Sequence, residues 1–138
     1  MVEARRVTYY GVGNGGAWME QAQGIGGIFF RAKDPGALAA WYQDNLGVTP
    51  VPTDMEKPPW FTEAGVTVFA PFPADTDYFP EGQQAMINFR VADLDAMLAQ
   101  LRDAGTECFN EQTMEGIGRF AHIRDPEGNV VELWEPAT

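Results

Sequence analysis

The chain has 138 residues, enough for one globular domain with its own core. Its 9 Lys and Arg against 20 Asp and Glu give a net charge of -11, so nucleic acids and anionic membranes would repel it. One Cys and one His exclude an internal disulfide framework, a thiolate metal cluster and any site that needs two imidazoles from one chain. No apolar run reaches the roughly 18 residues of a membrane span and no secretory leader is evident, so we expect a cytoplasmic protein.

Residues 1–23 differ from the rest of the chain, and we predict them to be an arm or leader before a single domain that spans 24–138. Gly11, Gly13 and Gly16 fit the pattern G-x-G-x-x-G of dinucleotide-binding loops. In such loops the third glycine opens a full helix, whereas this chain reaches further glycines after a few residues. A flexible arm is therefore the better interpretation.

An internal repeat organises the predicted domain. At an offset of 59 residues, segment 28–44 overlays segment 87–103 with 7 of 17 positions identical. Each copy opens with an alternating apolar run, 27–32 or 86–91, which predicts a strand with one covered face.

A helix is predicted directly after each of these strands. Asp34 and Asp93 each offer a carboxylate to the free amides of a first helical turn, and Gly47 and Gly105 follow as C-terminal stops. Trp41 and Tyr42 are expected to be packing residues. In the second helix the apolar positions fall at i, i+3, i+4 and i+7, which predicts a buried stripe formed by Leu94, Met97, Leu98 and Leu101.

Three short strand candidates follow each helix. They lie at 48–51, 60–63 and 66–70 in the first copy and at 106–110, 119–123 and 130–134 in the second. Each copy is therefore predicted to be a β-α-β-β-β module, at about 24–71 and 84–138, with 72–83 as the link. Neither module can cover its sheet face alone, so we expect the two to pack together, within one chain or between chains.

Several segments carry a resemblance to a known family. They are 30–35 (FRAKDP), 41–42 (WY), 46–47 (LG) and, most specifically, 125–136 (DPEGNVVELWEP). In these the chain resembles the vicinal-oxygen-chelate superfamily, which includes glyoxalase I, bleomycin-resistance proteins and extradiol dioxygenases. The resemblance implies an α+β fold whose two tandem modules form a curved eight-stranded mixed sheet around a cleft, usually in a homodimer. It does not fix the function, because this fold supports many chemistries.

The resemblance also implies where a metal ion would be bound. Metal-dependent members use one residue from each of four cleft strands, and the matching positions here are Gly27, Thr67 or Val68, Met86 and Glu132. Only Glu132 is a good ligand for a hard or borderline divalent ion. We therefore expect no cofactor and no catalytic metal, with a divalent ion held through Glu132 as the alternative.

Strand alternation assigns the side chains of each opening strand to two faces. The residues expected to meet the helices are Ile28, Phe30 and Ala32 in the first module and Ile87, Phe89 and Val91 in the second. The residues predicted to face the cleft and bind a ligand are Phe29, Arg31, Met86, Asn88 and Arg90. The two arginines either brace nearby acids or form forks for a carboxylate or phosphate of the ligand.

The end of the chain predicts a hairpin whose strands can be aligned. The run Asp125-Pro126-Glu127-Gly128 is typical of a type I turn followed by a left-handed glycine, which sets Asp125 opposite Asn129. Counting back places Ile123 opposite Val131 in the core.

The same count pairs His122 with Glu132, and Phe120 with Trp134, on the other face of the hairpin. A carboxylate beside an imidazole fixes its orientation, which a general acid or base requires. We predict His122 and Glu132 to be either such a catalytic pair or a cross-strand ion pair.

Apolar and aromatic side chains are expected to line the cleft, as in most ligand sites. They are Phe29, Met86, Phe120 and Trp134. The link is expected to be a loop that covers the cleft or a dimer seam, with Tyr78 and Phe79 as candidate contacts. Arg119 is a further candidate, and Cys108 is expected to be a small apolar side chain on a strand.

Three functions are compatible with these residues. The first is metal-independent binding of a small organic molecule, anionic or aromatic, in the cleft. The second is an enzyme of lyase or isomerase type in which His122 and Glu132 move a proton, and the third is a degenerate metal site at Glu132. The acidic surface favours a cationic ligand, but Arg31 and Arg90 favour an anionic group, and the local arginines carry more weight.

Overall fold

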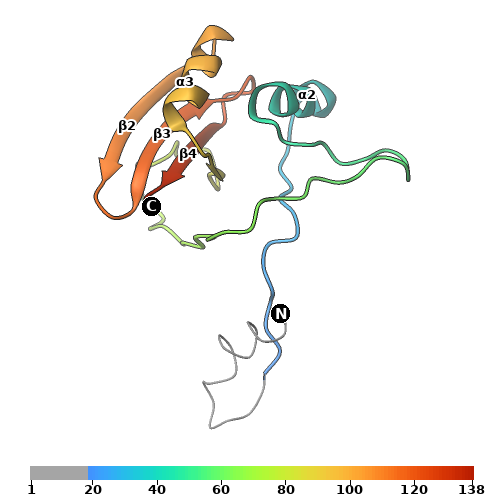
Figure 1. Ribbon diagram of the computed structural model, residues 1–138, viewed down its shortest axis with the longest axis horizontal. Helices are drawn as coiled ribbons and strands as arrows, with labels where there is room; N and C mark the ends of the chain where they lie inside the picture. Colours follow the sequence, from blue (N-terminus) through green and yellow to red (C-terminus); the bar gives the residue numbers. More distant parts are fainter. Residues whose placement is uncertain (1–18) are drawn as a thin grey trace. The chain divides into compact units, whose positions relative to one another are not determined.

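The structure, a computed structural model, describes residues 19–138 (Figure 1). The chain divides into two compact units, Met1–Arg31 and Ala32–Thr138. The glycine pattern at Gly11, Gly13 and Gly16 lies outside the described residues. In the described part of the first unit, residues 19–31, every residue is exposed and none is in a helix or strand.

Residues 32–138 contain two helices and a four-stranded mixed sheet. The helices are α2 (Pro35–Leu46) and α3 (Leu94–Asp103), and the strands are β1 (Asn88–Arg90), β2 (Cys108–Met114), β3 (Gly118–Arg124) and β4 (Val130–Pro136). The strand order is β1-β4-β3-β2, with β1 parallel to β4 and the other neighbours antiparallel. Figure 1 shows β2, β3 and β4 side by side in this order. The predicted α+β class is confirmed. In the described part of the chain, neither helix combines the length and the apolar character that crossing a bilayer requires.

Both helices begin at the predicted aspartates. Asp34 Oδ1 accepts the amide of Ala37 at 3.1 Å, and Asp93 Oδ1 accepts the amide of Ala96 at 3.0 Å. Each carboxylate thus satisfies an amide that the first helical turn leaves without a partner. The α2 helix ends at Gly47, whose φ of 72° is the left-handed conformation that glycine adopts without strain.

The core lies between the helices and one face of the sheet. Its buried members are Leu38 and Tyr42 of α2, Leu94, Leu98 and Leu101 of α3, Ala121 and Ile123 of β3, and Val131 and Leu133 of β4. Each fully buried leucine, isoleucine or valine contributes about 1.5–3 kcal/mol through apolar burial. The apolar stripe predicted for α3 is confirmed, and Met97, Phe89, Val91 and Cys108 pack partly buried against the same core.

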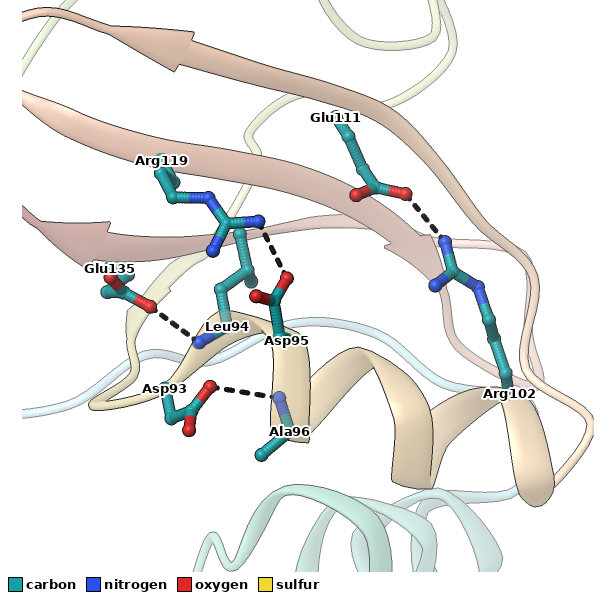
Figure 2. Close-up of polar contacts among 8 residues, drawn as sticks. All are labelled: Asp93, Leu94, Asp95, Ala96, Arg102, Glu111, Arg119 and Glu135. Atoms are coloured by element: carbon teal, nitrogen blue, oxygen red, sulfur yellow. Dashed lines mark hydrogen bonds and ion pairs between the residues drawn. The ribbon is translucent and has the colours of Figure 1, made fainter.

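Side chains of the sheet fix the position of α3 (Figure 2). Glu135 of β4 accepts the amide of Leu94 at 2.8 Å, so a strand residue satisfies an amide in the first turn of the helix. At the other end of α3, Arg102 pairs with Glu111 of β2 at 2.7 Å. These contacts hold the helix at both ends against β2 and β4.

Arg119 also belongs to this helix-facing side of the sheet. Its guanidinium pairs with Asp95 of α3 at 2.7 Å (Figure 2). Because side chains alternate along β3, Arg119 and His122 point to opposite faces. Arg119 therefore braces α3 on the face opposite to His122, and its contact with a ligand stays a prediction.

The terminal hairpin has the predicted register. His122 pairs with Glu132, Ile123 with Val131, and Phe120 with Trp134. Gly128 has a φ of 86°, the left-handed conformation that the turn requires.

The hairpin turn is also tied to α2. The carboxylate of Asp125, itself only 4% exposed, accepts the hydroxyl of Tyr42 at 2.7 Å. Glu127 accepts the amides of Lys33 and Asp34 at 2.7 and 2.9 Å, just before the helix begins. Asp125 and Glu127 thus tie the turn to α2, although sequence reasoning used them only to define the loop.

The predicted eight-stranded, two-module sheet is not confirmed. Residues 27–32, 48–51, 60–63 and 66–70, the strands expected of the first module, form no strand in the structure. Side chains that a complete sheet would cover are exposed, with Phe61 at 80%, Val68 at 68% and Phe69 at 84%. Ile28 and Phe30, expected in the core, are 51% and 49% exposed. A strand forms only when a neighbour supplies its hydrogen bonds, and prolines at 50, 52, 58 and 59 remove donors here.

Candidate functional site

A hydrogen-bonded cluster lies around Glu132, on the sheet face opposite to α3. Asn88 of β1 donates its amide to Glu132 Oε1 at 2.7 Å, and His122 of β3 donates Nε2–H to Oε2 at 3.1 Å. The hydroxyl of Tyr78 donates to the same Oε2. We call Tyr78, Asn88, Asn110, His122 and Glu132 the Glu132 network. Both Glu132 and His122 are buried, at 6% and 1% exposure.

Asn110 fixes the proton of the His122 ring. Its amide nitrogen lies 3.2 Å from His122 Nδ1, so Nδ1 accepts and Nε2 carries the proton. Asn110 has a φ of 53° where the pairing of β2 with β3 shifts between Phe109 and Gln112. Sequence reasoning missed this residue; asparagine tolerates the left-handed conformation best after glycine, but regular strand alternation does not locate a bulge.

Two aromatic rings enclose the imidazole. The ring of Tyr78 lies 5.0 Å from that of His122 at 83°, and the ring of Phe109 lies 5.7 Å away at 82°. Edge-to-face contacts of this kind fix the orientation of a ring as well as burying it. His122 is therefore held by hydrogen bonds at both nitrogens and by packing on its faces and edges.

Tyr78 comes from the link between the modules. In the same link, the side-chain amide of Gln83 donates to the carbonyl of Val130 at 2.8 Å, and its oxygen accepts the backbone amide of Val130 at 3.0 Å. The Gln83 side chain thereby supplies the two backbone partners that a neighbouring strand would give β4. This attachment brings Tyr78, one of the two candidate contacts predicted from the link, directly onto Glu132. Phe79, the other, packs on Phe72 at 5.7 Å.

The charge of the network is fixed by these contacts. Burial alone would raise the pKa of Glu132, but the hydrogen bonds from His122, Tyr78 and Asn88 together hold it below its usual range. Burial, and the hydrogen bond to Glu132, raise the pKa of the Tyr78 hydroxyl. At neutral pH Glu132 is therefore a carboxylate that only accepts, and Tyr78 is a neutral phenol that donates.

A second cluster lies farther along the same sheet face. The rings of Phe120 and Trp134 stack with centroids 5.9 Å apart and an interplanar angle of 2°. The indole N–H of Trp134 donates to the carbonyl of Ile117 at 3.0 Å, which fixes that ring. Phe120 remains partly exposed. Trp134 itself is only 8% exposed, so Phe120 is the accessible ring of this stacked pair, which we call the Phe120–Trp134 platform.

Arg90 lies beside this platform, because β1 pairs it with Trp134. Its guanidinium donates to the backbone carbonyl of Glu63 at 2.9 Å and lies 3.5 Å from that of Ala64. A Cβ atom on Gly65 would lie 2.1 Å from Arg90 Nη1, so the guanidinium would have to move away if position 65 carried a side chain. Arg90 is braced by carbonyl groups rather than by the acids that one of the two sequence interpretations expected.

The other predicted ligand-binding residues are distributed differently. Met86 is partly buried just before β1. Phe29, 96% exposed, and Arg31, also exposed, belong to the unit Met1–Arg31. The structure thus brings six of the predicted residues onto one sheet in two clusters: Asn88, His122 and Glu132, and Arg90, Phe120 and Trp134. The structure shows where these side chains lie, and the catalytic and ligand-binding roles of all the predicted residues, Phe29, Arg31 and Met86 included, stay predictions.

The residues of the network do not fit a divalent metal ion. Within residues 19–138, no three His, Cys, Asp or Glu side chains are grouped so that they could hold one. The lone pairs of Glu132 are directed at three donors, and the Nε2 atom of His122 carries a proton toward Glu132 rather than a free lone pair.

Solved structures with related folds were compared with the chain. A glyoxalase/bleomycin resistance protein from Streptomyces sp. CB03234 is 33% identical, but the match covers 36% of this chain and 42% of that chain, with a TM-score of 0.33. A lactoylglutathione lyase from Agrobacterium tumefaciens is 21% identical over 83% of this chain and 95% of that one, with a TM-score of 0.52. A member of the glyoxalase/bleomycin resistance protein/dioxygenase superfamily from Sphaerobacter thermophilus DSM 20745 is 20% identical over 75% and 90%, with a TM-score of 0.50.

The last two likenesses show the fold and not the activity. No curated protein matches the chain. The family model described as "Glyoxalase-like domain" matches residues 27–134, which include both helices, the link and all the strands up to Trp134. With the sheet, the hairpin register and this match in agreement, the chain belongs to the glyoxalase-like domain family of the vicinal-oxygen-chelate superfamily.

Proposed function

We propose that the protein binds a small aromatic carboxylate, without a metal ion or other cofactor, on the Phe120–Trp134 platform with Arg90 at its edge. The observation that carries the proposal is the stacked ring pair with a guanidinium on the next strand. A partly exposed aromatic ring, backed by a buried one and flanked by a charged group, suits a planar aromatic anion.

Arg90 supports the anionic part of the proposal. Within residues 19–138, no carboxylate lies within ion-pair distance of its guanidinium. The carbonyl groups of Glu63 and Ala64 orient the side chain but leave its positive charge uncompensated. A ligand carboxylate would supply the missing charge through the paired N–H groups that arginine presents.

The alternative is an enzyme in which His122 and Glu132 move a proton. It rests on their 3.1 Å contact. The geometry supports it less well, because both ring nitrogens of His122 and both oxygens of Glu132 already have partners. Replacing Glu132 by Gln separates the two functions: proton transfer would end with the carboxylate, whereas the affinity of the platform would change little.

Benzoate and its neutral isostere benzamide test the binding proposal. By isothermal titration calorimetry, the wild-type protein should bind benzoate at least about tenfold more tightly than benzamide, because a charge-assisted hydrogen bond is stronger than a neutral one. Arg90→Gln should remove this preference, and Phe120→Ala should weaken binding of both compounds.

Arg124→Gln is the matched control. Arg124 lies on the same face of β3 as Phe120, but its guanidinium pairs with Glu107 and covers the ring of Phe109. It should leave the preference unchanged. Equal binding of benzoate and benzamide by the wild-type protein would refute the proposal, as would an equal effect of the two arginine substitutions.

We also propose a homodimer in which a second copy of the chain covers the first module and helps to complete the eight-stranded sheet. The support is the row of exposed apolar side chains in segments that alternate like strands, among them Val68 and Phe69. Light scattering should give twice the 15.2 kDa of one chain, and Val68→Asp should lower that mass toward one chain. A wild-type mass of one chain at about 100 μM would contradict this assembly.

A further inference from the structure

The three donors to Glu132 do not have the same origin. Asn88 and His122 come from β1 and β3, the two strands that flank Glu132 in the sheet. Tyr78 comes from the link, which has no helix or strand of its own. Two donors are therefore part of the sheet, and the third is brought to it by a loop.

The Glu132 carboxylate stays satisfied when the third donor leaves. Without Tyr78, Oε1 keeps the amide of Asn88 and Oε2 keeps the Nε2–H of His122. The Tyr78 ring is held by contacts with His122 at 5.0 Å and with Phe72 at 5.6 Å, and Phe72 is itself 44% exposed. Removing Tyr78 would thus open a phenol-sized space beside a carboxylate that is already ionised and oriented.

We propose that Tyr78 is a displaceable occupant of a hydroxyaryl subsite, and that phenolic ligands bind by placing their hydroxyl on Glu132 in its stead. This inference rests on the proposed function, whose ligand class it narrows from aromatic carboxylates to those that also carry a hydroxyl group. Glu132 and Trp134 are two residues apart on β4, a rise of about 6.6 Å along one sheet face. One ring can therefore present a hydroxyl group to Glu132 and an acid group to Arg90.

The chemistry of Glu132 also determines what such a subsite rejects. An ionised carboxylate can only accept hydrogen bonds, so it accepts one from the hydroxyl of a phenol but cannot donate one to an ether oxygen. An ether in that place would leave the buried carboxylate facing a second acceptor, and a phenolate would face a like charge. The subsite therefore selects neutral phenols over their methyl ethers, as sites built around one hydrogen bond do.

The test uses 4-methylphenol, which is the detached tyrosine side chain, and 4-methylanisole, in which the hydroxyl hydrogen is replaced by methyl. Binding of both is measured by ligand-observed NMR and calorimetry. Tyr78→Ala should bind 4-methylphenol about tenfold more tightly than the wild-type protein, because no side chain has to be displaced, and it should prefer 4-methylphenol to 4-methylanisole. In the double variant Tyr78→Ala, Glu132→Gln this preference should fall several-fold.

Phe79→Ala is the matched control, since it removes the neighbouring aromatic side chain of the same link and should change neither affinity. Tyr78→Phe keeps the ring in place but removes its bond to Glu132, so it should raise the affinity for 4-methylphenol several-fold even if Tyr78→Ala folds poorly. The inference is overturned if neither Tyr78 variant gains affinity, or if 4-methylphenol and 4-methylanisole bind Tyr78→Ala alike.

Benzoate titrations of the same proteins distinguish this result from a failure of the proposed function. If benzoate binds but the hydroxyl group of 4-methylphenol adds no affinity over 4-methylanisole, the proposed function is supported and the hydroxyaryl subsite is refuted. If the Tyr78 variants gain affinity for 4-methylphenol and prefer it to 4-methylanisole, but benzoate does not bind, the subsite is supported and the carboxylate part of the proposed function is refuted.

Discussion

Replacing Glu132 by Ala should lower the free energy of unfolding by about 3 kcal/mol, the usual scale for removing one member of a buried polar network. The substitution removes the acceptor of three donors, and His122, at 1% exposure, cannot turn its Nε2–H to water. Urea unfolding followed by far-UV circular dichroism measures the change. A variant as stable as the wild-type protein would show that the network contributes nothing to the fold.

Glu107→Ala is the control for this experiment. Glu107 also pairs with a side chain of β3, since its Oε1 lies 3.0 Å from Arg124 Nε. Both side chains of this pair are exposed, Glu107 at 59% and Arg124 at 41%. Solvent screens such a pair, and we expect its loss to leave the unfolding curve nearly unchanged. The comparison separates the effect of burial from that of removing a negative charge from an acidic protein.

The dependence on pH supplies an independent readout of the same network. The pKa of Glu132 is lowered in the folded protein, so its contribution is fully present above the unfolded value of about 4.3 and is lost as the pH falls through the folded value. The difference in unfolding free energy between the wild-type protein and Glu132→Gln should therefore be largest near pH 7 and shrink below about pH 4. A difference that stays constant from pH 7 to pH 3 would show that ionisation of Glu132 is not coupled to folding.

The second half of the fold could be predicted from local signals. Asp93 and the leucines of α3 specify where a helix begins and which face it buries, and both signals lie within ten residues. The hairpin register followed from the turn residues 125–128 and from strand alternation. The same alternation placed His122 beside Glu132, the central contact of the site.

The first half could not be predicted in the same way. Its strand candidates have suitable apolar residues, such as Val66 and Val68, but alternation says only that a segment can pair and not that a partner is present. Strand formation depends on non-local hydrogen bonds, whereas a helix cap depends on residues three positions away. This is why Asp34 and Gly47 delimit α2 as predicted while the strands after it are not formed.

Strand alternation placed the site residues that lie in regular strands, but it did not place those that lie at a strand irregularity or in the link. Asn88 and Glu132 follow from alternation, but the contact of Asn110 with His122 depends on a register shift in β2. Gln83 replaces a neighbouring strand with one side chain, an arrangement that has no sequence period. Positions set by a bulge or by a single side-chain bridge need the tertiary structure to be seen.

Replacing Gly118 by Ala should destabilise the protein by about 2–4 kcal/mol and disrupt the Phe120–Trp134 platform. Gly118 has a φ of 138°, outside the range that alanine adopts comfortably. An added Cβ atom would lie 2.2 Å from the carbonyl oxygen of Glu135 and 2.7 Å from the indole nitrogen of Trp134. Both are closer than atoms can approach, and the neighbouring oxygen belongs to the backbone, so the end of β4 must move.

Gly116→Ala provides the matched control in the same turn. Gly116 also has a positive φ, 81°, but a Cβ there meets nothing within 4 Å. Its substitution should cost only the backbone strain of about 1 kcal/mol. Near-UV circular dichroism should therefore lose the signal of the stacked rings in Gly118→Ala and keep it in Gly116→Ala, and benzoate binding should follow the same order. Equal losses of stability in the two variants would mean that strain in the turn, and not the close packing of β3 against Trp134, is what requires glycine at position 118.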